Sequence, residues 1–287
     1  MLTIFTPAYN RRNELQRLYA SLVAQTNQDF EWLVIDDGSV DDTVSVMEGF
    51  MCESKIRIRF FSQENGGKMR AHNRGVERAE GELFVCIDSD DWLEPHAVSQ
   101  ILQDAPLIED DNVAGMMYLC LQGETNEVIG TVFPWDHQYC SYFDVYHQHH
   151  VTGDKTIVYK TSVMREFLFP EIDGEKFVPE ALIYNRISEK YVLLCVNVPA
   201  ARKEYLEDGY TNNYFNLCKK NPKAQILYYK ELYRKERTLY NVAAYNLYCI
   251  YGKVRFKDMV RNHPSRFWSF VMYLPAYVKH LLKERHA

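Results

Sequence analysis

The sequence predicts an α/β protein with a mostly parallel sheet flanked by helices, followed by a helical C-terminal extension. Three observations support this fold class. Short apolar segments alternate with amphipathic ones in the first half, polar clusters follow several apolar segments, and the chain from about Pro222 onwards has a helical pattern rich in Tyr and Leu. Repeated β-α units of this length favour a parallel sheet with helices on both faces.

The first four strands and their helices can be placed from local patterns. Leu15, Leu18 and Leu22 lie on one face of a helix expected over residues 10–24, and Asp41 or Asp42 could cap the helix that ends near residue 52. A third helix is expected over residues 68–79, and Pro95 suits the first turn of a fourth. The strands that alternate with these helices are expected at residues 2–6, 31–35, 56–62 and 82–87.

The pattern becomes less regular after residue 121. Strands are expected at residues 115–121, 156–160 and 191–198, and a helix at residues 178–190. The aromatic and His-rich segment 122–155 is interpreted as a loop that borders a site. The His residues at 147, 149 and 150 are interpreted as an exposed loop rather than a metal site, because their spacing is weak evidence for metal binding.

The composition is that of a water-soluble globular protein. The 287 residues are 47% hydrophobic and 25% charged. The seven cysteines form no CxxC pair, so we expect free thiols in a reducing compartment. No signal peptide is visible at the N-terminus and no window reaches the roughly 20 apolar residues of a membrane span. The expected location is the cytoplasm, either free or peripheral on the inner face of the plasma membrane.

Charge is distributed unevenly along the chain. Residues 253–287 hold eight Lys or Arg and two acidic side chains, a net charge of +6, so the rest of the chain carries −12. A basic segment on an acidic body suggests contact with an anionic surface. The acidic body would repel nucleic acid, so no nucleic-acid partner is expected.

The most informative motif is Asp88-Ser89-Asp90-Asp91, directly behind a strand-like apolar segment. Burying unpaired carboxylates is costly, so packing does not explain three of them at a strand end. Carboxylate oxygens suit Mg²⁺ or Mn²⁺, and the carboxyl ends of strands are where α/β sheets bind ligands. The motif therefore predicts a divalent cation beside a phosphorylated substrate.

Further polar clusters follow the other predicted strands. Tyr9 offers a ring for stacking on a base, and Asp37 offers an acceptor for the base's N–H groups. The glycines of the loop at residues 65–67 allow a close backbone approach, while Lys68 and Arg70 offer charge for a diphosphate. Each cluster alone also suits an ordinary turn or helix cap. Together, and in this order, they predict a nucleotide site.

The order of these motifs resembles family 2 glycosyltransferases of the GT-A fold. The residues that carry the resemblance read TPAYNR, then DDGS, then NGGK, then DSDD. It continues more weakly through residues 167–187 and 204–211, which are similar to bacterial surface or capsular polysaccharide members. The resemblance implies a nucleotide-sugar donor, usually UDP-linked, and inversion at the anomeric carbon.

The resemblance also implies roles for individual residues. Asp90 would coordinate Mn²⁺ or Mg²⁺, and Asp88 would lie near the ribose and the metal. The donor-binding set would be Thr6, Pro7, Tyr9, Arg11, Asp37, Gly67, Lys68, Arg70, Asn73, Asp88 and Ser89. This chain has His72 where many members have Arg, so Lys68 or Arg70 would substitute in contacting the diphosphate.

Inversion by direct displacement needs a base that takes the proton of the acceptor hydroxyl. Glu180 is the expected base, because it follows Pro179 at a predicted helix start where relatives often carry Glu-Asp. The alternative is that Glu180 only favours the helix N-terminus. Glu171, Asp173 and Glu175 are the other candidates. Arg202, Glu207 and Asp208 could help to close the site.

The expected domains are a catalytic domain over residues 1–210 and a helical extension over residues 211–287. Within the first, residues 1–120 would bind the nucleotide-sugar and residues 121–210 the acceptor, a glycan or a polyprenyl-diphosphate-linked sugar. Aromatic and basic side chains within residues 253–287 suit peripheral contact with a membrane. They equally suit packing on the body or in a homodimer, and both alternatives stay open.

Two other functions fit parts of the pattern. A nucleotidyltransferase also uses acidic metal ligands on an α/β sheet, but the loop at residues 6–12 lacks the glycines typical of that class. A catalytically inactive nucleotide-sugar-binding subunit of a synthase complex would keep Tyr9 and Asp37 without needing a base. A Rossmann dehydrogenase is disfavoured, because no GxGxxG follows the first strand.

Overall fold

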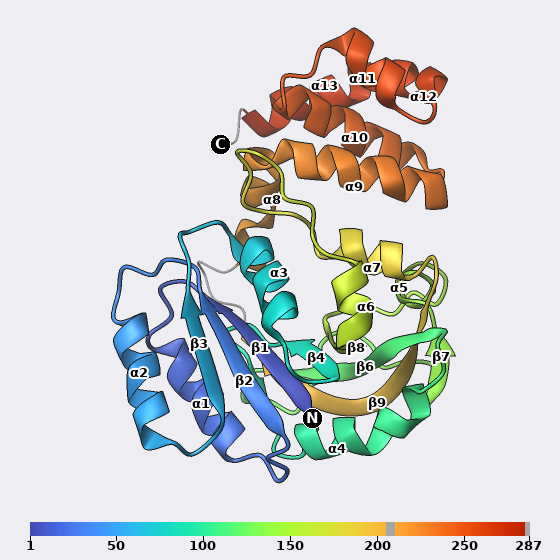
Figure 1. Cartoon of the computed structure of the whole chain (residues 1–287). Helices are drawn as coiled ribbons and strands as arrows, with labels where there is room; N and C mark the ends of the chain where they lie inside the picture. The colour runs from blue at the N-terminus through green and yellow to red at the C-terminus, as the bar shows by residue number, and fades with distance from the viewer. Residues whose placement is uncertain (205–209, 285–287) are drawn as a thin grey trace. The chain divides into compact units, whose positions relative to one another are not determined.

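The chain divides into two compact units. The computed structural model describes residues 1–204 and 210–284. The first unit comprises Met1–Phe169 and Ile183–Leu206, and the second comprises Pro170–Leu182 and Glu207–Ala287 (Figure 1). The segment 170–182, which holds the predicted base Glu180, therefore clusters with the C-terminal helices rather than with the sheet.

The first unit is built on a sheet of nine strands, whose parallel half is formed as predicted. Its order begins β3 (Ile58–Ser62), β2 (Phe30–Asp36), β1 (Leu2–Ala8) and β4 (Leu83–Cys86), and every neighbouring pair is parallel. Their carboxyl ends consequently lie along one edge. Beyond the strands, the Asp37 N–H still donates to the Ala8 carbonyl at 2.8 Å, so this edge stays ordered into the loops.

The other half of the sheet is mixed rather than parallel. The order continues β8 (Lys155–Lys160), β6 (Val113–Gln122), β9 (Val192–Lys203) and β5 (Trp92–Leu93). Strand β8 is antiparallel to both β4 and β6, while β6 and β9 are parallel to each other. The predicted loop at residues 122–155 was wrong in part, because it contains β7 (Gln138–Cys140), which pairs with β9, and helix α5 (Tyr142–His147).

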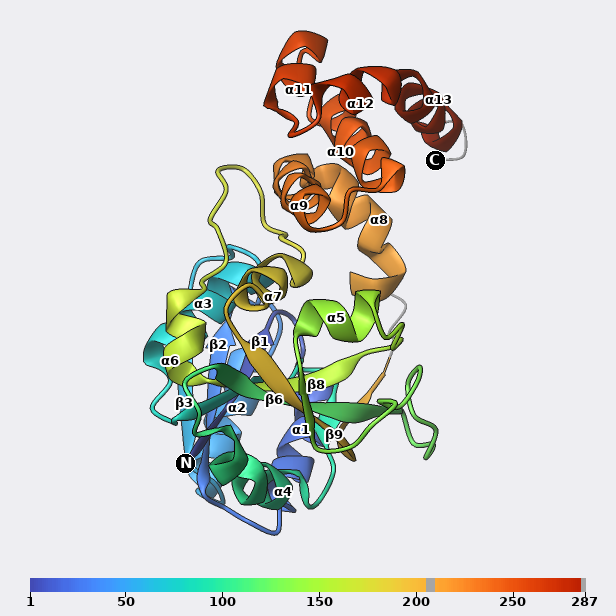
Figure 2. The same ribbon diagram turned by 90° about the vertical axis from the view of Figure 1, so that its right-hand side faces the viewer.

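Helices cover both faces of the sheet (Figure 2). On one face, α1 (Glu14–Val23), α2 (Thr43–Glu53) and α4 (Ala97–Asp104) bury their apolar sides in the main core, and the short η1 (Ala105–Ile108) follows α4. On the other face lies α3 (Lys68–Arg78). A Cβ on Gly75 would lie only 2.4 Å from the Phe5 ring, so the close packing of this helix on the sheet requires glycine at this position. Helix α6 (Thr161–Glu166) follows β8.

Several element boundaries differ from the sequence prediction, and two of them concern elements that carry or adjoin predicted site residues. The helix expected over residues 178–190 is the shorter α7 (Ala181–Ile187). Strand β9 was expected to end at residue 198 but continues to Lys203. Pro199 lacks an N–H and would end a regular ladder. Here the register with β6 shifts around Leu119, the partner of Pro199, and this irregularity lets the strand resume.

The second unit is helical. Its helices are α8 (Tyr210–Lys220), α9 (Pro222–Lys235), α10 (Leu239–Tyr251), α11 (Phe256–Asn262), α12 (Arg266–Val271) and α13 (Tyr273–Glu284). Tyr245, Cys249 and Met259 form a small core. Within residues 1–204 and 210–284, no helix combines the length and the apolar character needed to cross a membrane. All seven cysteines are free thiols.

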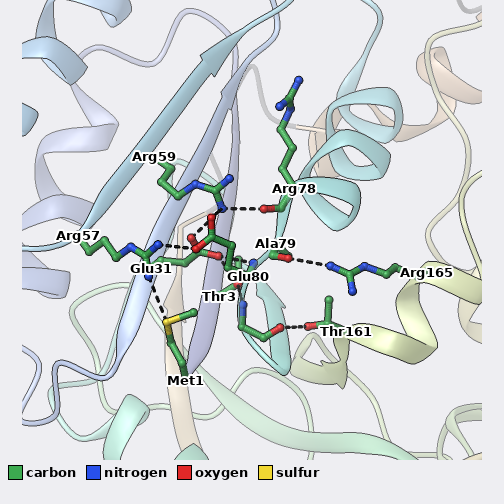
Figure 3. Close-up of polar contacts among 11 residues, drawn as sticks. Met1, Thr3, Glu31, Arg57, Arg59, Arg78, Ala79, Glu80, Thr161 and Arg165 are labelled. Carbon is green, nitrogen blue, oxygen red and sulfur yellow. Dashed lines mark hydrogen bonds and ion pairs between the residues drawn. The ribbon is translucent and has the colours of Figure 1, made fainter.

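A buried carboxylate fixes the amino ends of the parallel strands (Figure 3). Glu31 of β2 is fully buried and accepts hydrogen bonds from the Thr3 hydroxyl at 2.6 Å, the Glu80 N–H at 2.7 Å and Arg59 Nη1 at 3.0 Å. Burial alone would raise the pKa of Glu31, but these hydrogen bonds and the Arg59 charge outweigh it and lower the pKa. The contacts join β1, β2 and β3 to the connection between α3 and β4.

Replacing this carboxylate should destabilise the protein. Glu31→Gln places an amide N–H₂ against donors and leaves Arg59 without its buried partner, so we expect a loss of about 3 kcal/mol in the free energy of unfolding. Urea unfolding at pH 7 measures it, with Glu48→Gln on the exposed side of α2 as the matched control. Because the folded-state pKa of Glu31 is lowered, its contribution is complete above its ordinary value of 4.5 and lost as the pH falls. An unchanged midpoint at pH 7 would contradict this role.

Candidate active site

The candidate site lies at the carboxyl edge of β1, β2 and β4, where three polar loops meet. These loops follow Ala8, Asp36 and Cys86. The first two are joined by side chains: the Asn10 N–H donates to Ser39 Oγ at 2.8 Å, and Asn10 Oδ1 accepts from the Val40 N–H at 2.9 Å. Asn10 adopts a left-handed conformation with φ 54°, which Asn tolerates better than most residues. The preceding Tyr9 is 47% exposed, so its ring is available for stacking.

Asp37 organises the loop before α3. Its Oδ1 accepts from the Gly66 N–H at 2.8 Å and from Gln63 Nε2 at 2.6 Å, and its Oδ2 accepts from the Gly67 N–H at 2.7 Å. Gly67 has φ 94°, a conformation that favours glycine, and it directly precedes Lys68, the first residue of α3. The Asp37 carboxylate thus accepts three hydrogen bonds from the segment that leads into α3. Asp37 therefore shapes that loop, and its predicted contact with a base stays a prediction.

The motif Asp88–Asp91 forms a tight turn that cations hold from three sides. Lys68 of α3 lies 2.8 Å from the Asp88 carboxylate, and Lys203 at the end of β9 lies 2.8 Å from that of Asp91. The third cation, Arg17 of α1, donates to the Asp90 carbonyl at 2.9 Å and lies 3.8 Å from the centre of the Trp92 ring. The turn is thus fixed to α1, α3 and β9 at once.

The three carboxylates of this turn differ in their electrostatics. Burial raises the pKa of Asp88, but the Lys68 and Lys203 charges outweigh it and lower the pKa. Burial and the Asp88 charge raise the pKa of Asp90. Burial raises the pKa of Asp91 to about 7, with Lys203 opposing the rise and the other two carboxylates adding to it. Within the described residues, the Asp90 carboxylate forms no ion pair.

This donor set fits a divalent cation that is bound together with a diphosphate. Asp90 and Asp88 offer hard oxygen ligands, and their mutual repulsion is what a cation would relieve. Across residues 1–204 and 210–284, no three His, Cys, Asp or Glu side chains converge as a complete metal site. Mg²⁺-type sites commonly combine one or two carboxylates with substrate phosphates. The ligands that the protein lacks are those a diphosphate supplies.

Two predicted donor-binding residues have buried side chains with partners inside the protein. Thr6 is fully buried, and its hydroxyl accepts a hydrogen bond from Trp32 Nε1 at 3.1 Å. Side chains alternate between the two faces of a strand, and that of Thr6 points to a face covered by the core. Asn73 is also buried, and both ends of its amide pair with the Phe169 backbone at 2.9 Å. Neither side chain is presented to the edge.

The remaining predicted donor residues lie in the edge loops, in the last residues of β1 or in the first turn of α3. Pro7 is half-buried near the end of β1, Ser89 is buried within the Asp88–Asp91 turn, and Arg11 is half-buried with its N–H on Thr43 Oγ1 at 3.0 Å. Arg70 Nη1 donates to the Gly66 carbonyl at 3.1 Å, which adds a second link across the loop that Asp37 shapes.

The candidates for the base lie in the second unit. Glu180 is half-buried and directly precedes α7. Glu175 is buried, and its carboxylate accepts from the N–H groups of Lys223 and Ala224 at 2.7 and 2.8 Å. It therefore caps the amino end of α9 and is a poor candidate. Glu171 and Asp173 are exposed.

The residues expected to close the site were placed only in part. Arg202 pairs with Glu94 and donates to the Gly123 carbonyl at 3.1 Å, so it fastens a loop of the first unit. Glu207 and Asp208 lie outside the described residues. In the His-rich segment, His149 lies edge-on to Trp135 with ring centres 4.3 Å apart, and His147 stacks on Phe143.

Comparison with known sequences decides the family. The sequence profile described as glycosyl transferase family 2 matches residues 3–167, more than half of the chain. The chain belongs to glycosyltransferase family 2. It is 32% identical over 117 residues to the glycosyltransferase GlyA of Streptococcus pneumoniae, a match covering 41% of this chain and 17% of GlyA. It is 38% identical over 104 residues to the chondroitin synthase of Pasteurella multocida, covering 36% and 11%. The chain thus spans less than a fifth of these two relatives.

Solved structures show the same fold for this family 2 chain. The UDP complex of S. aureus TarS, residues 1–349, superposes with a TM-score of 0.61 at 15% identity, covering 99% of this chain and 91% of that one. The mannosyltransferase PcManGT of Pyrobaculum calidifontis, in complex with GDP-Man and Mn²⁺, gives 0.57 at 15% identity, covering 98% and 86%. The predicted GT-A fold is confirmed.

Sequence reasoning missed Arg17 and Lys203, two cations that hold the acidic turn of this family 2 chain. Arg17 lies in α1, 73 residues before the carbonyl that it contacts. Lys203 lies beyond Pro199, where the strand was expected to have ended already. The three carboxylates of the motif were themselves a signal, since such a cluster requires compensating cations.

The Lys203–Asp91 pair yields a stability prediction. Lys203→Met leaves Asp91 buried without its partner, so we expect a loss of about 3 kcal/mol in the free energy of unfolding, measured by urea. The double variant Lys203→Met/Asp91→Asn should regain most of it, because no unpaired charge remains. Lys190→Met, which removes an exposed pair with Glu166, is the matched control and should cost less than about 1 kcal/mol. Equal losses in the two Lys variants would contradict the assignment.

Proposed function

We propose that this chain is an inverting, metal-dependent glycosyltransferase that uses a UDP-linked sugar donor. The acceptor is a glycan or a polyprenyl-diphosphate-linked sugar in bacterial surface polysaccharide synthesis, and the transferred group is a hexose or an N-acetylhexosamine. The observation that carries the proposal is the Asp88–Asp91 turn, held by Lys68, Arg17 and Lys203 at the carboxyl edge of the sheet. Solved structures with the same fold are complexes with UDP, with UDP-GlcNAc, and with GDP-Man and Mn²⁺.

Each part of the donor has a proposed partner at this edge. The exposed ring of Tyr9 stacks on the uracil, with Pro7 beside it. The loop at residues 65–67, shaped by Asp37, brings backbone close to the nucleoside. Asp88 and Ser89 lie on the ribose side of the site.

The diphosphate binds where positive charge is already concentrated. Lys68 contacts Asp88, Arg70 lies beyond Met69 in the first turn of α3, and Arg11 lies in the loop after β1. Asp90 would hold Mn²⁺ or Mg²⁺, which when bound would supply a Lewis acid for the departing diphosphate. Lys68 exchanges part of its interaction with Asp88 for the phosphate oxygens and adds to that stabilisation.

The reaction is a single displacement at the anomeric carbon. The acceptor oxygen forms a bond to this carbon as its bond to the diphosphate breaks with the electron pair, which inverts the configuration and releases UDP. Glu180 accepts the proton of the acceptor hydroxyl. We assign donor binding to residues 1–120 and acceptor binding to residues 121–210, with residues 211–287 as a helical extension.

A screen of nucleotide-sugars with and without Mn²⁺, read out as released UDP, tests this function. The wild-type chain should release UDP from at least one UDP-sugar, and only with a divalent cation. Glu180→Gln should lower kcat by about 10²- to 10⁴-fold, the usual contribution of a general base. UDP binding should be retained.

Glu189→Gln, an exposed change shortly after α7, is the matched control and should keep full activity. Full activity of Glu180→Gln would refute the base, and the same screen on Glu171→Gln and Asp173→Asn would then locate it. UDP binding without turnover of any donor would instead support an inactive binding subunit. Conversion of a UDP-sugar and added pyrophosphate into UTP and a sugar 1-phosphate would support a nucleotidyltransferase.

A further inference from the structure

The last two helices expose an apolar face. Phe267, Phe270, Leu274, Val278, Leu281 and Leu282, here called the apolar stripe, follow one another at the spacing of one helix face across α12 and α13. Phe267 and Leu274 are each 66% exposed and Phe270 is 62% exposed. Single exposed apolar residues are ordinary, but a continuous row over four helical turns marks an interaction surface.

The same helices pack on their unit through small and polar side chains. Ser269 and Ala276 are buried on the side away from the stripe. The Ser269 hydroxyl donates to Asn246 Oδ1 at 2.8 Å, and Asn246 Nδ2 donates to the Ser269 carbonyl at 2.8 Å, which fixes α12 on α10. A surface helix normally turns its apolar side to the core. Here that arrangement is reversed, so the stripe is held outward by the fold.

The charge around the stripe is positive. Lys279 directly follows Val278 in α13 and is exposed. Arg266 is exposed at the start of α12, and Lys257 is exposed in the neighbouring α11. Residues 253–287 carry a net charge of +6, whereas the chain as a whole carries −6. An apolar row with a basic border is the pattern of a helix that lies in the interface of an anionic membrane.

A second copy of the chain fits this surface less well. A two-fold dimer through the stripe would place the same patch against itself, and so would oppose two segments of charge +6. A lipid surface meets both features at once, because acyl chains accept the apolar side chains and phosphate groups attract the basic border. Since α12 and α13 span 6 and 12 residues, they suit lying in the interface.

We propose that α12 and α13 bind the surface of an anionic membrane, with the apolar stripe at the acyl boundary and Lys279 and Arg266 facing the lipid phosphates. The surface does not depend on the transfer reaction, and it would bind lipid whether or not Glu180 is a base. It would place the second unit at the membrane, where a polyprenyl-linked acceptor is found.

Sedimentation of the full chain with vesicles tests the proposal. Vesicles of phosphatidylcholine with 30% phosphatidylglycerol are compared with pure phosphatidylcholine at low and high salt. The wild-type chain should sediment with the anionic vesicles, weakly with the neutral ones, and less at high salt. Phe267→Ser/Phe270→Ser/Leu274→Ser should reduce the partition coefficient at least tenfold. Lys257→Gln/Arg266→Gln/Lys279→Gln should remove the preference for anionic lipid.

The matched control is Val40→Ser/Leu107→Ser/Val132→Ser, which changes three exposed apolar side chains of the first unit. It should bind vesicles as the wild type does, and circular dichroism should show unchanged helix content in every variant. Equal vesicle binding by the stripe variant and the wild type would overturn the proposal, as would absence of wild-type binding. A wild-type dimer that the stripe variant loses in sedimentation velocity, without vesicle binding, would assign the face to a second copy instead.

Discussion

The acidic turn, in which lysines compensate two of three carboxylates, is the constraint on which the site depends. Asp88 and Asp91 are each matched by a lysine at 2.8 Å, one from α3 and one from β9, while Arg17 of α1 holds the carbonyl of Asp90. Removing either lysine would leave a carboxylate charge in a partly buried place, which is costly. The acidic turn therefore requires α1, α3 and β9 to bring their cations close to it. It explains why β9 extends beyond Pro199 to reach the site.

The same arrangement leaves the Asp90 carboxylate without an ion-pair partner among the described residues. Two carboxylates are neutralised by the protein, and the Asp90 carboxylate has a raised pKa because burial and the Asp88 charge disfavour its ionised form. A divalent cation would favour that form, and a diphosphate would then balance the cation and Lys68. At the opposite ends of the strands, Glu31 is satisfied by the protein alone. The amino end of these strands is thus closed by the protein's own hydrogen bonds, whereas the carboxyl end is the site that we propose for a ligand.

The sequence predicted features that depend on local pattern. The β-α units gave β1 to β4 and their common carboxyl edge, because periodicity and strand-end polarity are read within a few residues. It could not predict that the Asp37 carboxylate would accept hydrogen bonds from the Gly66 and Gly67 N–H groups. Nor could it predict that the Asn73 amide would hydrogen-bond to the Phe169 backbone, 96 residues away. These outcomes depend on tertiary contacts. The antiparallel half of the sheet escaped prediction for the same reason.

Binding of Mn²⁺ tests the central claim most directly, namely that the acidic turn holds a cation together with a nucleoside diphosphate. Electron paramagnetic resonance of free Mn²⁺, titrated with the chain in the presence and absence of UDP, counts the bound ions. The account predicts one Mn²⁺ per chain, bound more tightly with UDP, and no such site in Asp90→Asn. Equal Mn²⁺ binding by Asp90→Asn and the wild type, or no effect of UDP on the wild type, would contradict it.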